Sequence, residues 1–238
     1  MEDIVQFDFP TDSPKIIKVI GVGGGGGNAV NHMYHQGIGG VSFVLCNTDA
    51  QALRNSPVPV KVQLGAKGEG AGNIPEVAKK LAEESAAEVE ALFDDNTRMA
   101  FITAGMGGGT GTGAAPVVAR IAKEKGVLTV GIVTIPFLFE GEPKILQAFA
   151  GVEEMRKHVD ALLVINNERL CKIYPDLSWT TAFAKADDSL SNAARSIAEL
   201  VSKDGKINLD FADVRTTLKD GGAAVISTGS GEGEHRMS

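Results

Sequence analysis

Two clusters of glycine constrain this chain most, because each lies between an apolar, strand-like run and the start of a helical segment. The first, residues 21–26, reads G-x-G-x-x-G and directly follows the apolar run 16–22. The second, residues 105–113, holds six glycines in nine positions after the apolar run 99–104. Such a density would cost much conformational entropy if it only made a turn. A helix N-terminus offers free N–H groups and a dipole that favours anions, so both clusters predict phosphate binding.

A single G-x-G-x-x-G also fits a dinucleotide site, and Asp49 follows the second predicted strand, where such a site places an acidic residue. Two loops at two strand ends instead favour one polyphosphate held from both sides, with the hydroxyls of Thr110 and Thr112 as further donors. The sequence contains no G-x-x-x-x-G-K-[ST], so it is not a P-loop protein.

The order of apolar runs predicts the fold class. Expected strands at 16–22, 41–46, 60–64, 99–104, 127–134 and 161–165 alternate with expected helices at 28–35, from Pro75 onward, 114–125 and 144–158. Continuous apolar strands separated by helices predict a Rossmann-like parallel α/β sheet covered on both faces. A long helix is expected at 181–202, a short one at 213–219, and a last strand at 223–228 with no following partner. That strand predicts the start of a truncated second domain.

Composition excludes several classes of function. The formal net charge of −7 argues against a nucleic-acid-binding protein. No apolar run reaches the ~20 residues of a membrane span, and the N-terminus lacks the pattern of a signal peptide. Cys46 and Cys171 are expected to be reduced core thiols, and no Cys/His spacing suggests a protein-built metal site.

Further motifs identify a family. Residues 107–113, G-G-G-T-G-T-G, resemble the signature shared by tubulin and FtsZ. Residues 21–30 (GVGGGGGNAV), 47–49 (NTD), 139–141 (FEG) and 208–214 (NLDFADV) resemble FtsZ rather than tubulin. The resemblance runs in unbroken order over residues 15–234, so the chain is identified as similar to the FtsZ family of tubulin-like bacterial cell-division GTPases.

The resemblance implies a GTP/GDP site, with Mg²⁺ held through the phosphates and water. The residues it assigns to the phosphates and the loop above them are Gly23, Gly24, Gly25, Gly26, Ala71, Gly72, Asn73, Gly107, Gly108, Gly109, Thr110, Gly111, Thr112 and Gly113. Those it assigns to the ribose and base are Asn28, Glu140, Lys144, Asn167, Phe183 and Asp187. Chemistry supports guanine, since a carboxylate can accept from guanine N1–H and its 2-amino group together. The sequence leaves open whether Asp187 or the adjacent Asp188 faces the base.

The family's catalytic loop corresponds to Asn208, Asp210 and Asp213. A helix of about 25–30 Å separates this loop from Asp187, so it cannot serve the chain's own nucleotide. The resemblance therefore implies head-to-tail filaments in which each subunit completes its neighbour's site. It also implies a cytoplasmic location at the mid-cell division site and binding to other division proteins, with no membrane insertion.

These expectations divide the chain into four parts: a flexible arm at 1–14, a GTP-binding domain at 15–180, a central helix at 181–203, and the catalytic loop, short helix and first strand of a further domain at 204–238. Because that further domain is expected to be incomplete, this chain is expected to bind nucleotide but to assemble and hydrolyse poorly.

Overall fold

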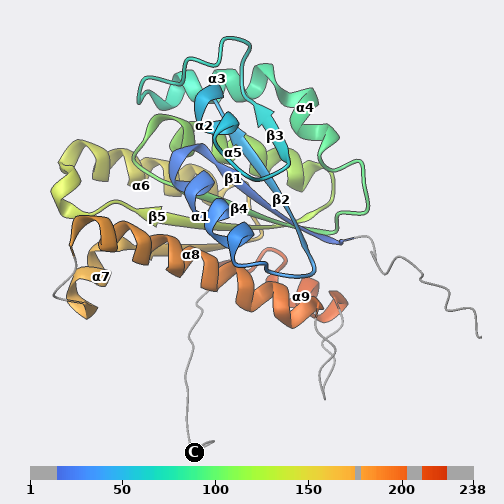
Figure 1. The fold of residues 1–238 in the computed structure, drawn as a ribbon. Helices are drawn as coiled ribbons and strands as arrows, with labels where there is room; N and C mark the ends of the chain where they lie inside the picture. Colours follow the sequence, from blue (N-terminus) through green and yellow to red (C-terminus); the bar gives the residue numbers. More distant parts are fainter. Residues whose placement is uncertain (1–14, 175–177, 203–210, 224–238) are drawn as a thin grey trace, which may run out of the picture.

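A computed structural model describes residues 15–174, 178–202 and 211–223, and it shows a parallel sheet between two layers of helices (Figure 1). The sheet is seven-stranded in the order β3-β2-β1-β4-β5-β6-β7. Its strands are β1 (Ile17–Val22), β2 (Val41–Asn47), β3 (Val60–Gln63), β4 (Met99–Gly105), β5 (Leu128–Ile135), β6 (Ala161–Asn166) and β7 (Gly222–Ala223). This architecture confirms the predicted fold class.

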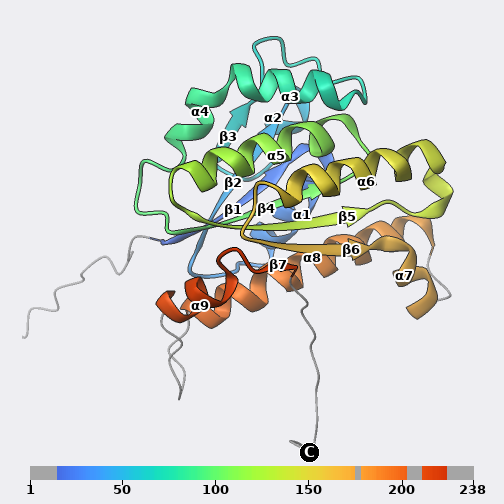
Figure 2. The same cartoon turned by 180° about the vertical axis from the view of Figure 1, so that it is seen from behind.

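The helices divide between the two faces of the sheet. They are α1 (Gly23–His35), α2 (Ala50–Arg54), α3 (Pro75–Glu84), α4 (Ala86–Ala91), α5 (Gly109–Glu124), the short 3₁₀ turn η1 (Leu138–Glu140), α6 (Glu142–Arg156), α7 (Asn167–Ile173), α8 (Trp179–Ser202) and α9 (Phe211–Leu218). Helices α3 to α6 cover one face, and α1, α8 and α9 cover the other (Figures 1 and 2). None of the described helices is both long and apolar enough to cross a membrane.

Alternation along β1 shows why both layers are needed. Ile17 and Val19 pack in the core beneath α1 and α8, while Ile20 and Val22 pack in the core beneath α5. All four side chains are buried. A strand that is apolar on both sides is stable only between two covering layers, as the continuous apolar runs predicted.

Helices α1 and α5 begin earlier than predicted, and one predicted long helix is broken in two. Helix α1 begins at Gly23 rather than residue 28, and α5 begins at Gly109 rather than residue 114. The glycines expected in loops therefore make up the first helical turns. Pro75 begins α3 as predicted, but the long helix expected there breaks at Ser85 (φ −102°, ψ 22°). Along these two helices Ala78, Ala82 and Val89 are buried, whereas Val77 is exposed.

The last strand was expected to lack a partner, and this was wrong. Gly222 and Ala223 form β7, which pairs in parallel with the start of β6. The rest of the predicted strand and the predicted arm at 1–14 lie outside the described residues, and the proposed division into four parts stays a prediction.

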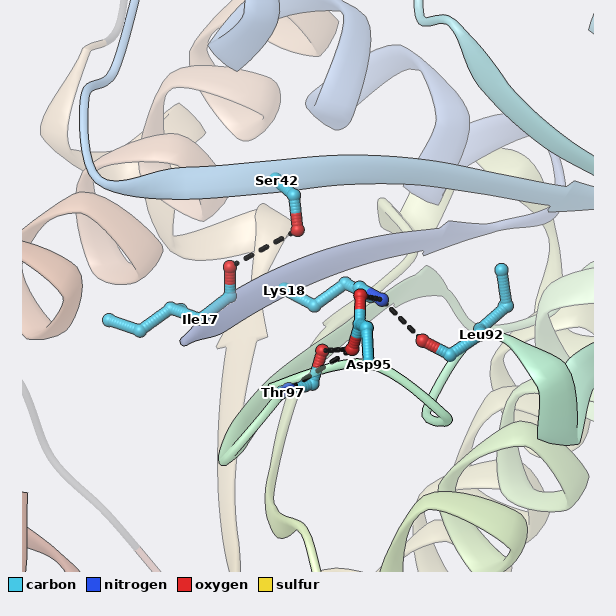
Figure 3. Close-up of polar contacts among 6 residues, drawn as sticks. All are labelled: Ile17, Lys18, Ser42, Leu92, Asp95 and Thr97. Atoms are coloured by element: carbon cyan, nitrogen blue, oxygen red, sulfur yellow. Dashed lines mark hydrogen bonds and ion pairs between the residues drawn. The ribbon is translucent and has the colours of Figure 1, made fainter. Parts of the chain in front are cut away.

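An ion pair between buried Lys18 and half-exposed Asp95 fixes the connection between α4 and β4 (Figure 3). Lys18 on β1 is only 5% exposed, and its Nζ donates to the Leu92 carbonyl and to Asp95 Oδ2 at 2.7 Å. The Thr97 N–H donates to the other oxygen of Asp95 at 3.0 Å. The next residue, Arg98, places its guanidinium 4.4 Å from the ring centroid of Phe211 and so holds the start of α9. These contacts place α9 at the edge of the sheet where the strands begin.

Candidate nucleotide-binding site

The strand order creates a crevice between β1 and β4. From β1 the chain proceeds outward to β2 and β3, and it then returns to the other side of β1 with β4. Loops at such a switch point diverge, and ligands bind outside the carboxyl ends of the strands. Each glycine cluster directly follows one of these two strands. A cavity of about 390 Å³ lies there. Its lining residues are Gly24, Gly25, Asn28, Gly105, Met106, Gly108, Thr134, Pro136, Glu140, Lys144, Asn167, Phe183, Ala186, Asp187 and Leu190.

The glycines of the first cluster have two different roles. Gly24 and Gly25 are exposed and line the cavity, and a Cβ on Gly24 would meet no atom within 4 Å. Gly23 has φ +73°, and a Cβ on Gly26 would lie 2.2 Å from the Thr103 carbonyl oxygen. Gly23 and Gly26 therefore let the backbone turn and pack, while Gly24 and Gly25 present it to a ligand.

In the second cluster, Gly105, Met106 and Gly108 line the cavity. Gly107 has φ +99°, and its N–H donates to Thr112 Oγ1 at 2.9 Å. The predicted site residues Gly109, Thr110, Gly111, Thr112 and Gly113 do not line the cavity. Of these, the three glycines make close backbone contacts, and the Thr110 hydroxyl bonds to that of Thr48 at 2.7 Å. Many of the residues predicted to contact the phosphates therefore support the conformation of the loop and do not line the cavity.

The segment containing Ala71, Gly72 and Asn73 lies beside the second glycine cluster without lining the cavity. Ala71 is buried, whereas Gly72 and Asn73 adopt positive φ values of 57° and 62°. A Cβ on Gly109 would lie 2.9 Å from the Asn73 Cα. The segment is therefore close enough to respond to the conformation of the second cluster.

The opposite end of the cavity holds the residues predicted to contact the base. Asn167 is 5% exposed, and its Oδ1 has no hydrogen-bond partner among the described residues, which is costly for a buried acceptor unless a ligand supplies the donor. Phe183 packs edge-on against Phe137 with centroids 5.3 Å apart. Asn28 on α1 and Asp187 on α8 face the same space. This end offers the aromatic ring of Phe183 beside the Asn167 acceptor and the Asp187 carboxylate.

The structure separates the two adjacent carboxylates. Asp187 lines the cavity, whereas Asp188 Oδ1 lies 2.8 Å from His32 Nε2 on α1. Burial raises the pKa of Asp187 to about 6, with the nearby His32 lowering it and Asp188 raising it. Burial disfavours the charged form of Asp187, and His32, the group that lowers its pKa, pairs with Asp188 instead. The Asp187 carboxylate is therefore available to a ligand that carries hydrogen-bond donors.

Glu140 and Lys144 lie together at the remaining side of the cavity. Lys144 Nζ is 3.3 Å from Glu140 Oε2, and the other oxygen of Glu140 accepts from the Phe137 N–H at 3.0 Å. The pair therefore places one cationic and one anionic side chain together in the lining of the cavity.

Four lining residues lie outside the predicted site: Thr134, Pro136, Ala186 and Leu190. Gly105 and Met106 belong to the second glycine cluster but were not among the residues assigned to the phosphates. Thr134 and Pro136 could have been found, because they lie at the carboxyl end of the next parallel strand. Ala186 and Leu190 could have been found from their spacing of three and seven residues after Phe183, which places them on its helical face. Asp49, the basis of the dinucleotide alternative, instead caps α2 by accepting from the N–H groups of Gln51 and Ala52.

Of the predicted catalytic residues, Asp213 alone lies in the described part of the chain, and it does not line this cavity. Asn208 and Asp210 lie outside the described residues. Asp213 is exposed on α9, at the edge where the strands begin, while the cavity lies where they end. The seven residues of β4 separate these edges by about 20 Å.

Comparison with known proteins places these features in a family. The family model described as "Tubulin/FtsZ family, GTPase domain" matches residues 16–175. "Cell division protein FtsZ" of Porphyromonas gingivalis is 65% identical over 244 residues, covering 100% of this chain and 53% of that protein. The protein of the same name from Pseudomonas putida is 50% identical over 237 residues, covering 97% and 59%.

Solved structures agree with these sequence matches. An empty FtsZ dimer of M. jannaschii is 44% identical with a TM-score of 0.85, over 90% of this chain and 63% of that one. The GDP-bound CetZ1 monomer of Haloferax volcanii is 26% identical with a TM-score of 0.73, over 87% and 65%. This chain spans between about half and two thirds of the length of these relatives.

Proposed function

Because this chain belongs to the tubulin/FtsZ family, we propose that it binds GTP and GDP in the cavity between its two glycine clusters and takes part in GTP hydrolysis during bacterial cell division. The observation that carries the proposal is the composition of the two ends of that cavity. One end exposes backbone at Gly24, Gly25 and Gly108, and the other presents a half-buried carboxylate at Asp187 and, at Asn167, a buried acceptor without a partner among the described residues.

The base end suits guanine. Guanine donates from N1–H and from its 2-amino group, and Asp187 is an acceptor for both, while adenine would turn an unprotonated N1 toward the carboxylate. Phe183 supplies a face on which a purine can stack, and Asn167 can accept a further donor. A charged acceptor facing an unprotonated nitrogen is strongly unfavourable, so discrimination against adenine follows from the same contact.

The glycine end suits phosphates. The N–H groups at the start of α1 and α5 lie at the positive ends of two helix dipoles, and Lys144 adds a cation. No group of three or more Asp, Glu, His or Cys side chains arranged to hold a metal occurs in the described ranges. The lining carboxylates Glu140 and Asp187 do not form such a set, so we propose that Mg²⁺ binds through the phosphates and water, where it neutralises phosphate charge.

Hydrolysis requires a group that positions the attacking water, and we propose that Asp210 and Asp213, with Asn208, act on the nucleotide of the next subunit. Asp213 lies at the opposite edge of the sheet from the cavity, which supports a contact between subunits rather than within one. Stacking that joins one edge to the other does not close on itself and makes a filament. The empty dimer of the M. jannaschii relative supports self-association.

The remaining proposals follow from the relatives' name. We propose that the whole protein works in the cytoplasm at the mid-cell division site, with copies of itself and with other division proteins. Since the chain covers 53% of the P. gingivalis relative, we expect the 238-residue chain alone to bind nucleotide while assembling and hydrolysing more slowly than a full-length relative.

The first test is nucleotide identity. The purified chain is denatured, any released nucleotide is identified by chromatography, and the emptied protein is titrated with GDP, ADP and NAD. Guanine nucleotide in the supernatant and preference for GDP would support the proposal. Preference for ADP or NAD would overturn it. Hydrolysis is tested by substituting Asp210→Ala in a full-length form, where turnover that persisted with intact filaments would refute the catalytic assignment.

A further inference from the structure

His32 lies outside the cavity but one helical turn from a residue that lines it. Asn28 faces the cavity from α1, and His32 follows four residues later on the same face of that helix. Across from it, α8 carries Asp187 toward the cavity and Asp188 toward His32. The contact between α1 and α8 therefore lies directly beside the carboxylate proposed to bind the base.

A chain of polar contacts joins the two helices at this point. His32 Nε2 is 2.8 Å from Asp188 Oδ1 and 2.6 Å from Gln36 Nε2. Gln36 in turn accepts from Arg195, and Lys185 lies 3.5 Å from the second oxygen of Asp188. The ends of this chain are both on α8, and its centre is the His32 ring on α1.

The two contacts at Nε2 compete. A carboxylate needs a proton on Nε2, whereas the Gln36 N–H needs a lone pair there, and one nitrogen cannot provide both. The amide oxygen of Gln36 is already held by Arg195, so its N–H groups face the ring. The bond to Asp188 therefore forms when Nε2 carries a proton and weakens when it does not.

We propose that His32 is a specificity-determining positioning residue for guanine: by holding Asp188 against α1, it leaves Asp187 alone in the cavity to accept from the base. This inference rests on the proposed guanine site and adds a residue that does not touch the ligand.

The charges around His32 support this role. Adjacent carboxylates repel, so an Asp188 without a partner disfavours ionisation of Asp187, and a cation near both favours it. His32 lowers the pKa of Asp187, and Asp188 raises it. Among the described residues, the charged and titratable groups that face His32 or its partners are Asp187, Asp188, Lys185 and Arg195 on α8.

The experiment measures GDP and IDP affinity of the purified chain against pH for wild type, His32→Ala and His32→Arg. His35→Ala is a matched control, because its ring bonds to the Asn31 carbonyl of its own helix. At pH 7, His32→Ala is expected to weaken GDP binding about two- to fivefold, as for loss of a half-exposed ion pair. In His32→Ala, the loss of GDP affinity on acidification should begin at a higher pH than in wild type. In His32→Arg, it should begin at the wild-type pH.

IDP lacks the 2-amino group of guanine. The ratio of the IDP to the GDP dissociation constant therefore measures how much the contact between Asp187 and that group contributes to affinity. His32→Ala should lower this ratio, and His35→Ala should leave it unchanged. An unchanged ratio together with an unchanged pH of affinity loss in His32→Ala, or equal changes in both variants, would overturn the inference. Failure of the wild-type chain to bind GDP would instead refute the proposed function.

Discussion

Gly113 on α5 lies so close to Pro75 on α3 that a Cβ added to Gly113 would be 1.9 Å from the Pro75 carbonyl oxygen. The obstructing atom belongs to the backbone and cannot rotate away. The last glycine of the G-G-G-T-G-T-G run is therefore required by the packing of two helices. Since α3 follows the segment 70–73, this packing also determines how closely that segment approaches the second glycine cluster.

We predict that Gly113→Ala destabilises the fold. The methyl group must push α3 and α5 apart, and overpacking of this kind costs about 3 kcal/mol. Urea unfolding of the nucleotide-free chain measures the loss. A variant with wild-type stability would show that the two helices can separate without cost.

Gly24→Ala should preserve the stability of the fold but weaken GDP binding. Its Cβ meets no atom within 4 Å, and alanine favours helix over glycine by up to about 1 kcal/mol, so stability should hold or rise. The methyl group would nevertheless occupy space in the cavity where the backbone meets phosphate, and GDP affinity should fall about tenfold, or about 1.4 kcal/mol. Calorimetric titration beside the same unfolding assay separates the two effects. Unchanged GDP affinity would remove Gly24 from the site.

These two glycines also show what the sequence could predict. The order of the apolar runs correctly predicted the parallel sheet, and the two glycine clusters indicated the strand ends beside which the cavity lies. They could not distinguish Gly24 from Gly113, because the distinction depends on which backbone lies opposite, and that is set by contacts between distant segments. Asp187 and Asp188 were ambiguous for the same reason: a partner on α1, 155 or more residues away, decides which one faces the cavity.

Asp187→Asn should change the base preference from guanine toward xanthine. An amide can donate to the 2-oxo group of xanthine, where guanine has a donor. GDP should weaken at least tenfold, and XDP should bind better than it does to wild type. Competition titration with both nucleotides measures this. Asp188→Asn is the matched control and should keep the preference for GDP, because Asp188 lies against His32. A swap of preference in Asp188→Asn instead would reverse the assignment.

The pKa of Asp187 predicts opposite pH effects on stability and on binding. Its pKa is about 6 in the folded chain and near 4 when unfolded, so between these values the folded state binds more protons. The free energy of unfolding of the empty chain should therefore decrease as pH rises from about 4 to 6, as far as this group contributes. GDP affinity should increase over the upper part of that range, because the base requires the ionised form.

Both effects are measured as differences between wild type and Asp187→Asn, since contributions from other carboxylates then cancel. Denaturation and GDP titration at several pH values from 4.5 to 7 supply the two curves. Parallel curves for the two proteins would contradict the assigned titration.

The ion pair between Lys18 and Asp95 should show strong coupling. Asp95→Asn leaves the buried Lys18 ammonium with the Leu92 carbonyl and without its counter-charge, at a cost of about 2 kcal/mol, less than for a fully buried pair because Asp95 is half-exposed. Lys18→Met fits an apolar chain into the same space, so its cost should be within about 1 kcal/mol. The double variant should then be more stable than Asp95→Asn alone, since no uncompensated charge remains. Urea unfolding of all four proteins gives the coupling free energy, and simple additivity would show that the lysine reaches water by another route.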